Sequence, residues 1–252
     1  MDRQRIRQLY EQLAAGIAYV AVETPTGDQS IGTAFHVGEG IFVTAAHVLK
    51  NNSILEIGTT ERAIAKKEEH AHGRLIETTY WPGKGRVVGG PYFHPNESID
   101  VAALRVEGIS APVIPLGGHL DDWIVDSQFV LEEVVVMGYP PVPFSKEPLL
   151  VSTLAEVNAV VDKYTGGHPH FIVSALARGG FSGGIALTEE GHTLGVITES
   201  LGQNGKPEEL GFLAVLTVEP IFVTLGHHKI MPVAMDEEWR MFDEKESFWL
   251  RG

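Results

Sequence analysis

Three segments of this sequence carry residue types that can cooperate in acyl transfer. His47 ends a strand-like run, Asp100 precedes another such run, and Ser182 stands inside the glycine-rich segment 179–184. A serine hydroxyl is a poor nucleophile at neutral pH and needs a base to take its proton. Histidine is the base whose pKa lies closest to neutral pH, and a carboxylate can fix its tautomer. The residue types therefore predict a nucleophile, a general base and an orienting acid.

The glycines around Ser182 predict a tight turn that a substrate carbonyl can approach closely. In such a turn, the backbone N–H groups of Gly180 and Ser182 are expected to face the oxyanion that develops during attack. This pair is the predicted oxyanion hole.

Two other interpretations of the same residues stay open. Gly180-Phe181-Ser182-Gly183-Gly184 also fits the nucleophile elbow of α/β-hydrolases, although in those enzymes the acid and the histidine follow the serine. Alternatively, His47 is a core histidine, Asp100 caps a strand and the glycines form an ordinary hairpin turn. The first alternative does not match the order of the motifs and the second needs three unrelated roles, whereas a triad accounts for all three segments together.

The elements that must position these residues are short, β-prone and separated by turns. The chain has 28 Gly and 14 Pro, which mark frequent turns. Many short strands joined by frequent turns favour a barrel pair or sandwich over an α/β fold. An amphipathic helix is predicted over residues 2–15, with Asp2 as N-cap and Gly16 at its end. Residues 66–95 are polar and irregular and are predicted to form loops, and residues 119–127 to hold a helical turn.

The three motifs resemble those of the trypsin-like, chymotrypsin-fold serine peptidases, whose triad order is His, Asp, Ser. The motifs Thr-Ala-Ala-His, Asp-Val-Ala-Ala-Leu and Gly-x-Ser-Gly-Gly all match, at His47, Asp100 and Ser182. The match continues downstream in segments 195–200 and 211–215. The chain contains no Cys, which makes it resemble the bacterial Deg-type branch more than the disulfide-rich digestive branch. The resemblance implies a serine endopeptidase acting on polypeptides through an acyl-enzyme intermediate.

The same resemblance implies an all-β fold of two packed antiparallel six-stranded β-barrels, with a short N-terminal helix and a C-terminal tail. The expected divisions are a helix at residues 1–16, an N-terminal barrel at 17–118, a C-terminal barrel at 119–225 and a tail at 226–252. His47 and Asp100 then come from the first barrel and Ser182 from the second.

Substrate-binding roles also follow from the resemblance, for Leu176, Ala177, Thr198, Glu199, Ser200 and Gly211. Leu176 and Ala177 are expected at the base of the specificity pocket, with Ser200 and Gly211 as its walls. Because no acid stands at the base, we expect a preference for apolar or small side chains before the cut. Thr198 is expected to donate a hydrogen bond to Asp100.

One departure from the family concerns the residue before the nucleophile. Members that are activated by clipping have an Asp there, whereas this chain has Phe181. Activation through a newly formed N-terminus is therefore not expected. What orders the oxyanion loop stays open, and binding of a ligand or partner is one hypothesis.

Composition excludes several other functions. The formal net charge is −14, from 19 Lys+Arg against 33 Asp+Glu, and no basic stripe suited to nucleic acid is present. No window approaches the roughly 20 apolar residues of a membrane span, so a soluble, cytoplasmic protein is expected. No phosphate-binding loop is recognised and no cofactor is expected. The histidine pairs 70/72, 168/170 and 227/228 are a weak metal signal, so no metal is expected either.

Two further hypotheses concern activity and partners. A catalytically silent trypsin-like protein that binds peptides or acts as a scaffold is the alternative to an enzyme. Stand-alone modules of this kind also resemble components of bacterial stress or defence systems that a protein activator switches on. Glu237, Glu238 and Trp239 are candidate contacts for such an activator, and packing of this tail on the protein's own body is the competing interpretation.

Overall fold

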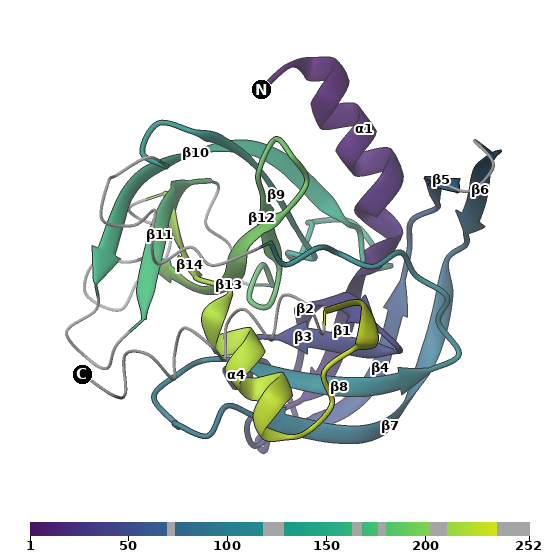
Figure 1. Ribbon diagram of the computed structural model, residues 1–252. Coiled ribbons are helices and arrows are strands. Elements are labelled where there is room, and N and C mark those ends of the chain that lie inside the picture. The colour runs from purple at the N-terminus through teal and green to yellow at the C-terminus, as the bar shows by residue number, and fades with distance from the viewer. Residues whose placement is uncertain (70–73, 118–128, 163–167, 176–179, 202–210, 236–252) are drawn as a thin grey trace, which may run out of the picture.

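Two closed antiparallel β-barrels lie side by side in the computed structural model of this chain (Figure 1). The structure describes residues 1–69, 74–117, 129–162, 168–175, 180–201 and 211–235. Each barrel contains six strands, and a short helix precedes the first one. The predicted fold class, two six-stranded barrels with an N-terminal helix, is confirmed.

The N-terminal barrel closes by pairing between its first and fourth strands along the chain. In order around the barrel, its strands are β1 (Ile17–Glu23), β2 (Gln29–Gly38), β3 (Ile41–Thr44), β8 (Ala102–Glu107), β7 (Gly83–Phe93) and β4 (Ser53–Thr59). Strands β3 and β8 are antiparallel neighbours with Thr44 opposite Ala102. The chain therefore leaves β3 at the place where it enters β8.

The C-terminal barrel is built in the same way. In order around the barrel, its strands are β10 (Val151–Asp162), β11 (Pro169–Ser174), β14 (Phe212–Leu216), β13 (Thr193–Leu201), β12 (Ile185–Leu187) and β9 (Glu133–Gly138). Its interior holds large apolar side chains with almost no exposure, among them Phe171 and Val196. Burial of such side chains stabilises the barrel by roughly 1.5–3 kcal/mol each.

Helices lie at both ends of the described chain. Helix α1 (Arg3–Leu13) begins at Asp2, whose side chain accepts a hydrogen bond from the Gln4 backbone N–H, and it continues into a 3-10 turn, η1 (Ala14–Gly16). Helix α4 (Glu219–His227) follows the last strand and packs on the N-terminal barrel (Figure 1). A second 3-10 turn, η2 (Val233–Met235), lies beyond it. Within the described residues, no helix is long and apolar enough to span a membrane.

The loops predicted for residues 66–95 are wrong. This part of the chain contains β6 (Arg74–Tyr80) and most of β5 (Ala63–Glu69), which form a two-stranded sheet, and also β7 of the barrel. The second half of β6 is exposed, and the residues of β7 alternate between half-buried and exposed. Polar residues can therefore stand in both of these regular strands. Their sequence therefore lacks the apolar run by which a buried strand is recognised.

A tyrosine of the second barrel fixes the two barrels together. Tyr139 follows β9 and is 1% exposed, and its ring meets that of Tyr19 edge-to-face at 5.7 Å between centroids. Its hydroxyl lies 3.0 Å from Thr60 Oγ1 and 3.3 Å from the carbonyl oxygen of Ile17. Burial raises the pKa of this phenol to about 12, so the hydroxyl stays protonated and can act as a donor at neutral pH.

Candidate active site

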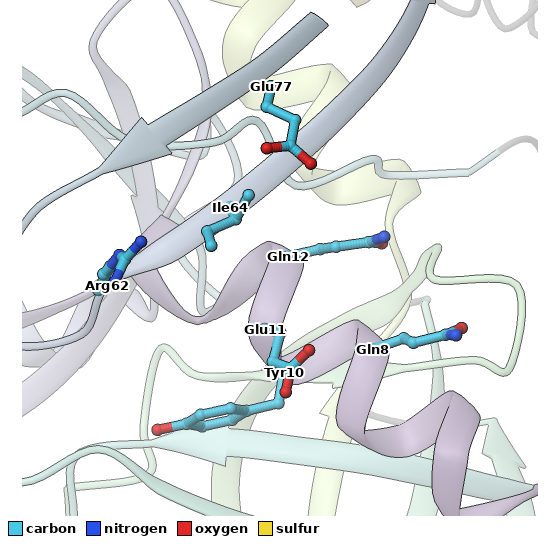
Figure 2. A pocket seen from close by; sticks show the side chains of 7 residues that line it. All are labelled: Gln8, Tyr10, Glu11, Gln12, Arg62, Ile64 and Glu77. Atoms are coloured by element: carbon cyan, nitrogen blue, oxygen red, sulfur yellow. The ribbon is translucent and has the colours of Figure 1, made fainter. Parts of the chain in front are cut away.

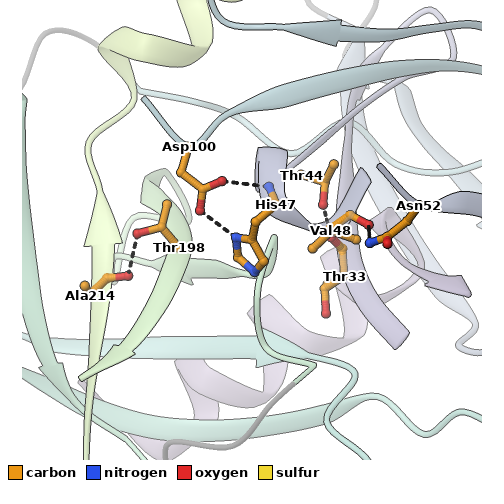
Figure 3. Close-up of polar contacts among 8 residues, drawn as sticks. All are labelled: Thr33, Thr44, His47, Val48, Asn52, Asp100, Thr198 and Ala214. Carbon is orange, nitrogen blue, oxygen red and sulfur yellow. Dashed lines mark hydrogen bonds and ion pairs between the residues drawn. The ribbon is translucent and has the colours of Figure 1, made fainter. Parts of the chain in front are cut away.

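His47 and Asp100 meet where β3 ends and β8 begins (Figure 3). His47 lies on the one-turn helix α2 (Ala46–Leu49), and Asp100 lies two residues before β8. The backbone N–H of His47 donates to Asp100 Oδ1 at 2.8 Å, and Nδ1 of the ring lies 2.7 Å from Asp100 Oδ2. Since a carboxylate only accepts, the proton lies on Nδ1 and the Nε2 lone pair of a neutral ring is left to act as a base.

This pair lies at the surface rather than in the core. The side chains of His47 and Asp100 are 50% and 26% exposed. Water therefore screens the charge of the carboxylate in part, and the two hydrogen bonds define the orientation of the ring. The half-exposed imidazole is accessible to a polypeptide in solution.

Ser182 lies in a tight turn immediately before β12, against the N-terminal barrel. Its carbonyl accepts a hydrogen bond from the backbone N–H of Thr33 on β2 at 2.8 Å. The next residue, Gly183, has φ +83°, and a Cβ there would lie 1.9 Å from the carbonyl oxygen of Thr33 and 2.3 Å from Thr44 Oγ1. Because only glycine permits this approach, Ser182 is brought beside the strand end that leads to His47.

The backbone donors of this turn divide into two groups. The N–H groups of Gly183 and Gly184 donate to the carbonyls of Ile197 and Phe181, each at 2.7 Å. Those of Gly180 and Ser182 donate to no acceptor among the residues that the structure describes. An oxyanion hole requires such uncommitted donors, and these are the two that the sequence predicts for it.

The predicted nucleophilic role of Ser182 requires a hydrogen bond from its hydroxyl to the His47 ring. Catalytic hydrogen bonds of this kind often close only when substrate binds. The role of Ser182 as nucleophile therefore stays a prediction, whereas its place in the turn and the His47–Asp100 contact are features of the structure.

Thr198 does not make its predicted hydrogen bond to Asp100. Its hydroxyl donates to the carbonyl of Ala214 at 3.5 Å, and the side chain is 2% exposed (Figure 3). The cause is an irregularity in β13, where the register against β14 shifts between Ile197 and Glu199. Thr198 is the extra residue at this shift, and its hydroxyl therefore faces the neighbouring strand.

The predicted specificity pocket is described only in part. Leu176 and Ala177 lie outside the described residues. Glu199 and Ser200 belong to β13, where Ser200 pairs with Leu213 of β14, and Gly211 precedes β14 with φ +68°. The segments predicted for the two pocket walls are thus the facing ends of adjacent strands.

A pocket beside His47 was not found by sequence reasoning. It has a volume of about 190 Å³ and is lined by Ala46, Lys50, Phe93, His94, Glu97 and Ile99. Ala46 and Ile99 immediately precede His47 and Asp100, so the pocket adjoins the pair. Burial lowers the pKa of His94, although a hydrogen bond to the Asn96 carbonyl opposes this shift. Periodicity could not reveal the pocket, because its residues come from two segments that are distant in the sequence.

A second, larger recess lies between α1 and β5 and shares no residue with the His47–Asp100 pair (Figure 2). It is mostly polar and is lined by Gln8, Tyr10, Glu11, Gln12, Arg62, Ile64 and Glu77. Tyr10 donates to Glu61 Oε2 at 2.8 Å, and the Arg62 guanidinium stacks over the Trp81 ring at 4.9 Å. The Tyr10 bond joins the helix to the segment that leads into β5, whereas Arg62 and Trp81 flank the two strands of the small sheet.

The other interpretations of the motifs can now be compared with the structure. The α/β-hydrolase interpretation is wrong, because a strand of an antiparallel barrel follows Ser182 rather than a helix. His70 and His72 lie outside the described residues. Among those that are described, no group of three or more His, Asp or Glu side chains is placed to hold a metal ion.

Comparison with known structures shows the same double-barrel fold. The active form of the Rv3671c protease from M. tuberculosis has a TM-score of 0.60 and 19% identity, covering 92% of this chain and 89% of that one. A variant of the HtrA-type protease AlgW with a tripeptide has a TM-score of 0.59 and 17% identity, covering 89% and 63%. A serine endoprotease from Yersinia pestis has a TM-score of 0.56 and 16% identity, covering 89% and 66%.

These solved structures are likenesses of fold, and the chain spans less than two thirds of the length of the AlgW chain that it matches. No curated protein matches the sequence at a significant level. A family model described as trypsin-like peptidase domain matches residues 32–196, which is well over half of the chain and includes His47, Asp100 and Ser182. The chain belongs to the trypsin-like peptidase domain family.

Proposed function

We propose that this protein is a serine endopeptidase that cleaves polypeptides through an acyl-enzyme intermediate. The observation that carries the proposal is the pair of hydrogen bonds from His47 to Asp100, at 2.7 and 2.8 Å. The glycine turn that holds Ser182 approaches Thr44, at the end of the strand that leads to His47. Membership of the trypsin-like peptidase family and the peptide-bound state of the similar AlgW structure support the same activity.

In the proposed reaction, Ser182 Oγ attacks the carbonyl carbon of the scissile bond while His47 Nε2 takes the hydroxyl proton. The carbonyl oxygen becomes an oxyanion that accepts hydrogen bonds from the N–H groups of Gly180 and Ser182. His47 then gives its proton to the departing amine, leaving an ester on Ser182. Water, deprotonated by His47, attacks this ester and releases the carboxylic acid product, while His47 returns the proton to Ser182 Oγ. Asp100 keeps the ring oriented in both halves of the cycle.

For substrate preference we propose apolar or small side chains before the cut. The reason is the absence of an acid at the position of Leu176. The separate pocket beside His47, lined by both apolar and charged side chains, would receive another substrate side chain close to the scissile bond. A peptide-library profile dominated by Arg or Lys before the cut would contradict the preference.

A protein activator is proposed as a separate point. Its candidate contacts, Glu237, Glu238 and Trp239, lie outside the described residues. The proposal rests on the resemblance to partner-switched modules, and an equal kcat/KM with and without candidate activators would count against it.

Labelling with a fluorophosphonate probe tests the catalytic proposal. Wild-type protein should be labelled and should turn over peptide substrates, and Ser182→Ala should do neither. Ser145→Ala is a matched control, because Ser145 lies in a different loop and its hydroxyl donates to the Glu147 carbonyl at 2.6 Å. Labelling of Ser182→Ala would refute the assignment of the nucleophile. A folded wild-type protein with neither labelling nor turnover would favour a peptide-binding protein without catalytic activity.

A further inference from the structure

Thr33, on β2 of the N-terminal barrel, is a fully buried polar residue whose hydrogen-bonding groups all reach other segments. Its backbone N–H donates to the Ser182 carbonyl at 2.8 Å, and its hydroxyl donates to the Gly180 carbonyl at 2.6 Å. The same hydroxyl accepts from the Tyr139 backbone N–H at 2.9 Å. Its carbonyl accepts from Thr44 Oγ1 at 2.6 Å. One residue thus contacts three other segments, two of which lie 106 and 147 positions away in the sequence.

The two carbonyls that Thr33 holds belong to the residues proposed to supply the oxyanion-hole donors, Gly180 and Ser182. Holding a carbonyl fixes the plane of the peptide that follows the residue, so Thr33 holds the Gly180–Phe181 and Ser182–Gly183 peptides. The peptide that carries the Ser182 N–H lies between these two held planes, and the one that carries the Gly180 N–H directly precedes the first of them. Gly180 has φ +91°, and a Cβ there would lie 2.4 Å from the Tyr139 carbonyl oxygen and 2.8 Å from Pro140 Cα. Gly180 is therefore enclosed by Thr33 on one side and by the segment after β9 on the other.

The link continues from Thr33 toward the general base. Thr44, whose hydroxyl donates to the Thr33 carbonyl, is the last residue of β3 and stands three residues before His47. Thr33 therefore connects the strand that leads to the base with the turn that carries the nucleophile. It joins them across the junction of the two barrels, through buried groups that water does not reach.

The side chain of the residue before the nucleophile does not supply such a link. Phe181 is 2% exposed and contacts Gly138, where a Cβ would lie 2.7 Å from Phe181 Cδ1. An apolar ring anchors the turn by packing, but it forms no directional bond that could set the orientation of neighbouring peptides. The hydrogen bonds from Thr33 provide that direction.

We propose that Thr33 is a positioning residue, whose hydroxyl and backbone N–H hold the Gly180–Ser182 turn in the geometry that aims its N–H groups at the oxyanion. The consequence for catalysis rests on the proposed function. Thr33 touches no reacting atom, so its effect is exerted through Gly180 and Ser182. It acts from the N-terminal barrel on a turn of the C-terminal barrel.

Replacement of the hydroxyl tests this role. Thr33→Val has almost the same shape but leaves the Gly180 carbonyl and the Tyr139 N–H without their partner, whereas Thr33→Ser keeps the hydroxyl. We expect kcat to fall about 10- to 100-fold in Thr33→Val with KM little changed, which is less than the loss of an oxyanion donor itself. Thr33→Ser should stay within about threefold of wild type.

Thr224→Val is the matched control. Thr224 is also fully buried, and its hydroxyl donates to the Pro220 carbonyl at 2.8 Å, but it lies on α4. This variant loses the same type of bond and should keep the wild-type kcat. If Thr224→Val lowered kcat as much as Thr33→Val, the effect would be a general loss of packing, and the positioning role would be wrong.

Amide hydrogen exchange provides a readout that does not depend on activity. In Thr33→Val, the N–H groups of Gly183 and Gly184 should exchange at least about tenfold faster, with the strands of both barrels unchanged, and Thr33→Ser should restore protection. If Thr33→Val does not fold, Thr33→Ala replaces it in both assays. If the wild-type protein showed no turnover, but Thr33→Val and Thr33→Ser still gave this exchange pattern, the proposed function would be refuted and the positioning role supported. Unchanged exchange in the variant that lacks the hydroxyl would overturn the positioning role.

Discussion

Replacement of Asp100 by asparagine separates the geometry of the proposed triad from its charge. The carboxylate accepts two hydrogen bonds from His47, one from the backbone N–H at 2.8 Å and one from Nδ1 at 2.7 Å. An amide has one oxygen, so it can satisfy only one of these donors. If the oxygen keeps the backbone N–H, the NH₂ group faces Nδ1 and requires that nitrogen to accept.

The expected magnitude follows from this tautomer change. A neutral imidazole that accepts at Nδ1 carries its proton on Nε2 and cannot take the proton of Ser182. In a serine protease of the chymotrypsin fold, the same replacement lowers kcat by about 10⁴, and this loss sets the scale. A factor of 10⁴ corresponds to about 5.4 kcal/mol of activation free energy. Because the Asp100 side chain is 26% exposed, water can replace the lost acceptor, and folding stability should fall by only about 1 kcal/mol.

The assay compares steady-state cleavage of a peptide ester or amide with thermal unfolding of the same samples. Asp100→Asn should lose about 10⁴ in kcat and only a few degrees of melting temperature. Asp28→Asn is the control, since Asp28 is exposed in a turn and accepts from Thr26 Oγ1. A kcat within about tenfold of wild type for a folded Asp100→Asn would refute the reasoning, because the ring would then not depend on the Asp100 carboxylate.

Two further predictions concern stability. Gly183→Ala should destabilise the protein by at least about 4 kcal/mol in denaturant unfolding, because the new Cβ would lie 1.9 Å from a backbone oxygen. Gly27→Ala is the control: Gly27 has a similar φ but nothing within 4 Å, and its replacement should cost about 1 kcal/mol. Equal losses in the two variants would contradict the predicted clash. Burial lowers the pKa of His36 below its ordinary value of 6.5, so the unfolded chain binds this proton more readily than the folded one. The stability that neutral His36 contributes is therefore complete above about pH 6.5 and is lost as the pH falls through the folded-state pKa. His36→Gln should show a shallower fall in melting temperature between about pH 8 and about pH 5 than wild type, and an identical fall would show that other groups cause it.

The residues proposed to carry the chemistry could be identified from the sequence because each stands in a local pattern. A glycine-rich turn around Ser182 is needed wherever a backbone must approach another closely, and here Gly183 meets Thr33 for that reason. His47 and Asp100 could be identified because each adjoins a strand-like run. The helix at the N-terminus was visible from its cap at Asp2 and its apolar spacing.

Other features lie in contacts that no local pattern encodes. The hairpin of β5 and β6 was missed because β-sheets with exposed faces accept polar residues. The partner of Thr198 depends on a register shift between two strands, and a shift of one residue redirects a side chain. The pocket beside His47 combines segments that meet only in the folded barrel.

The sequence by itself therefore determined the order of the motifs, the two-barrel class and the proposal for the chemistry, because these depend on residue types and on backbone needs within a few positions. Tertiary structure alone decided how the turn around Ser182 is held. Thr33 and Gly180 are 147 positions apart in the chain, and the hydrogen bond between them exists only because two barrels pack against each other. Such a bond depends on distance and direction in space, and a threonine in an apolar strand carries no local signal of either.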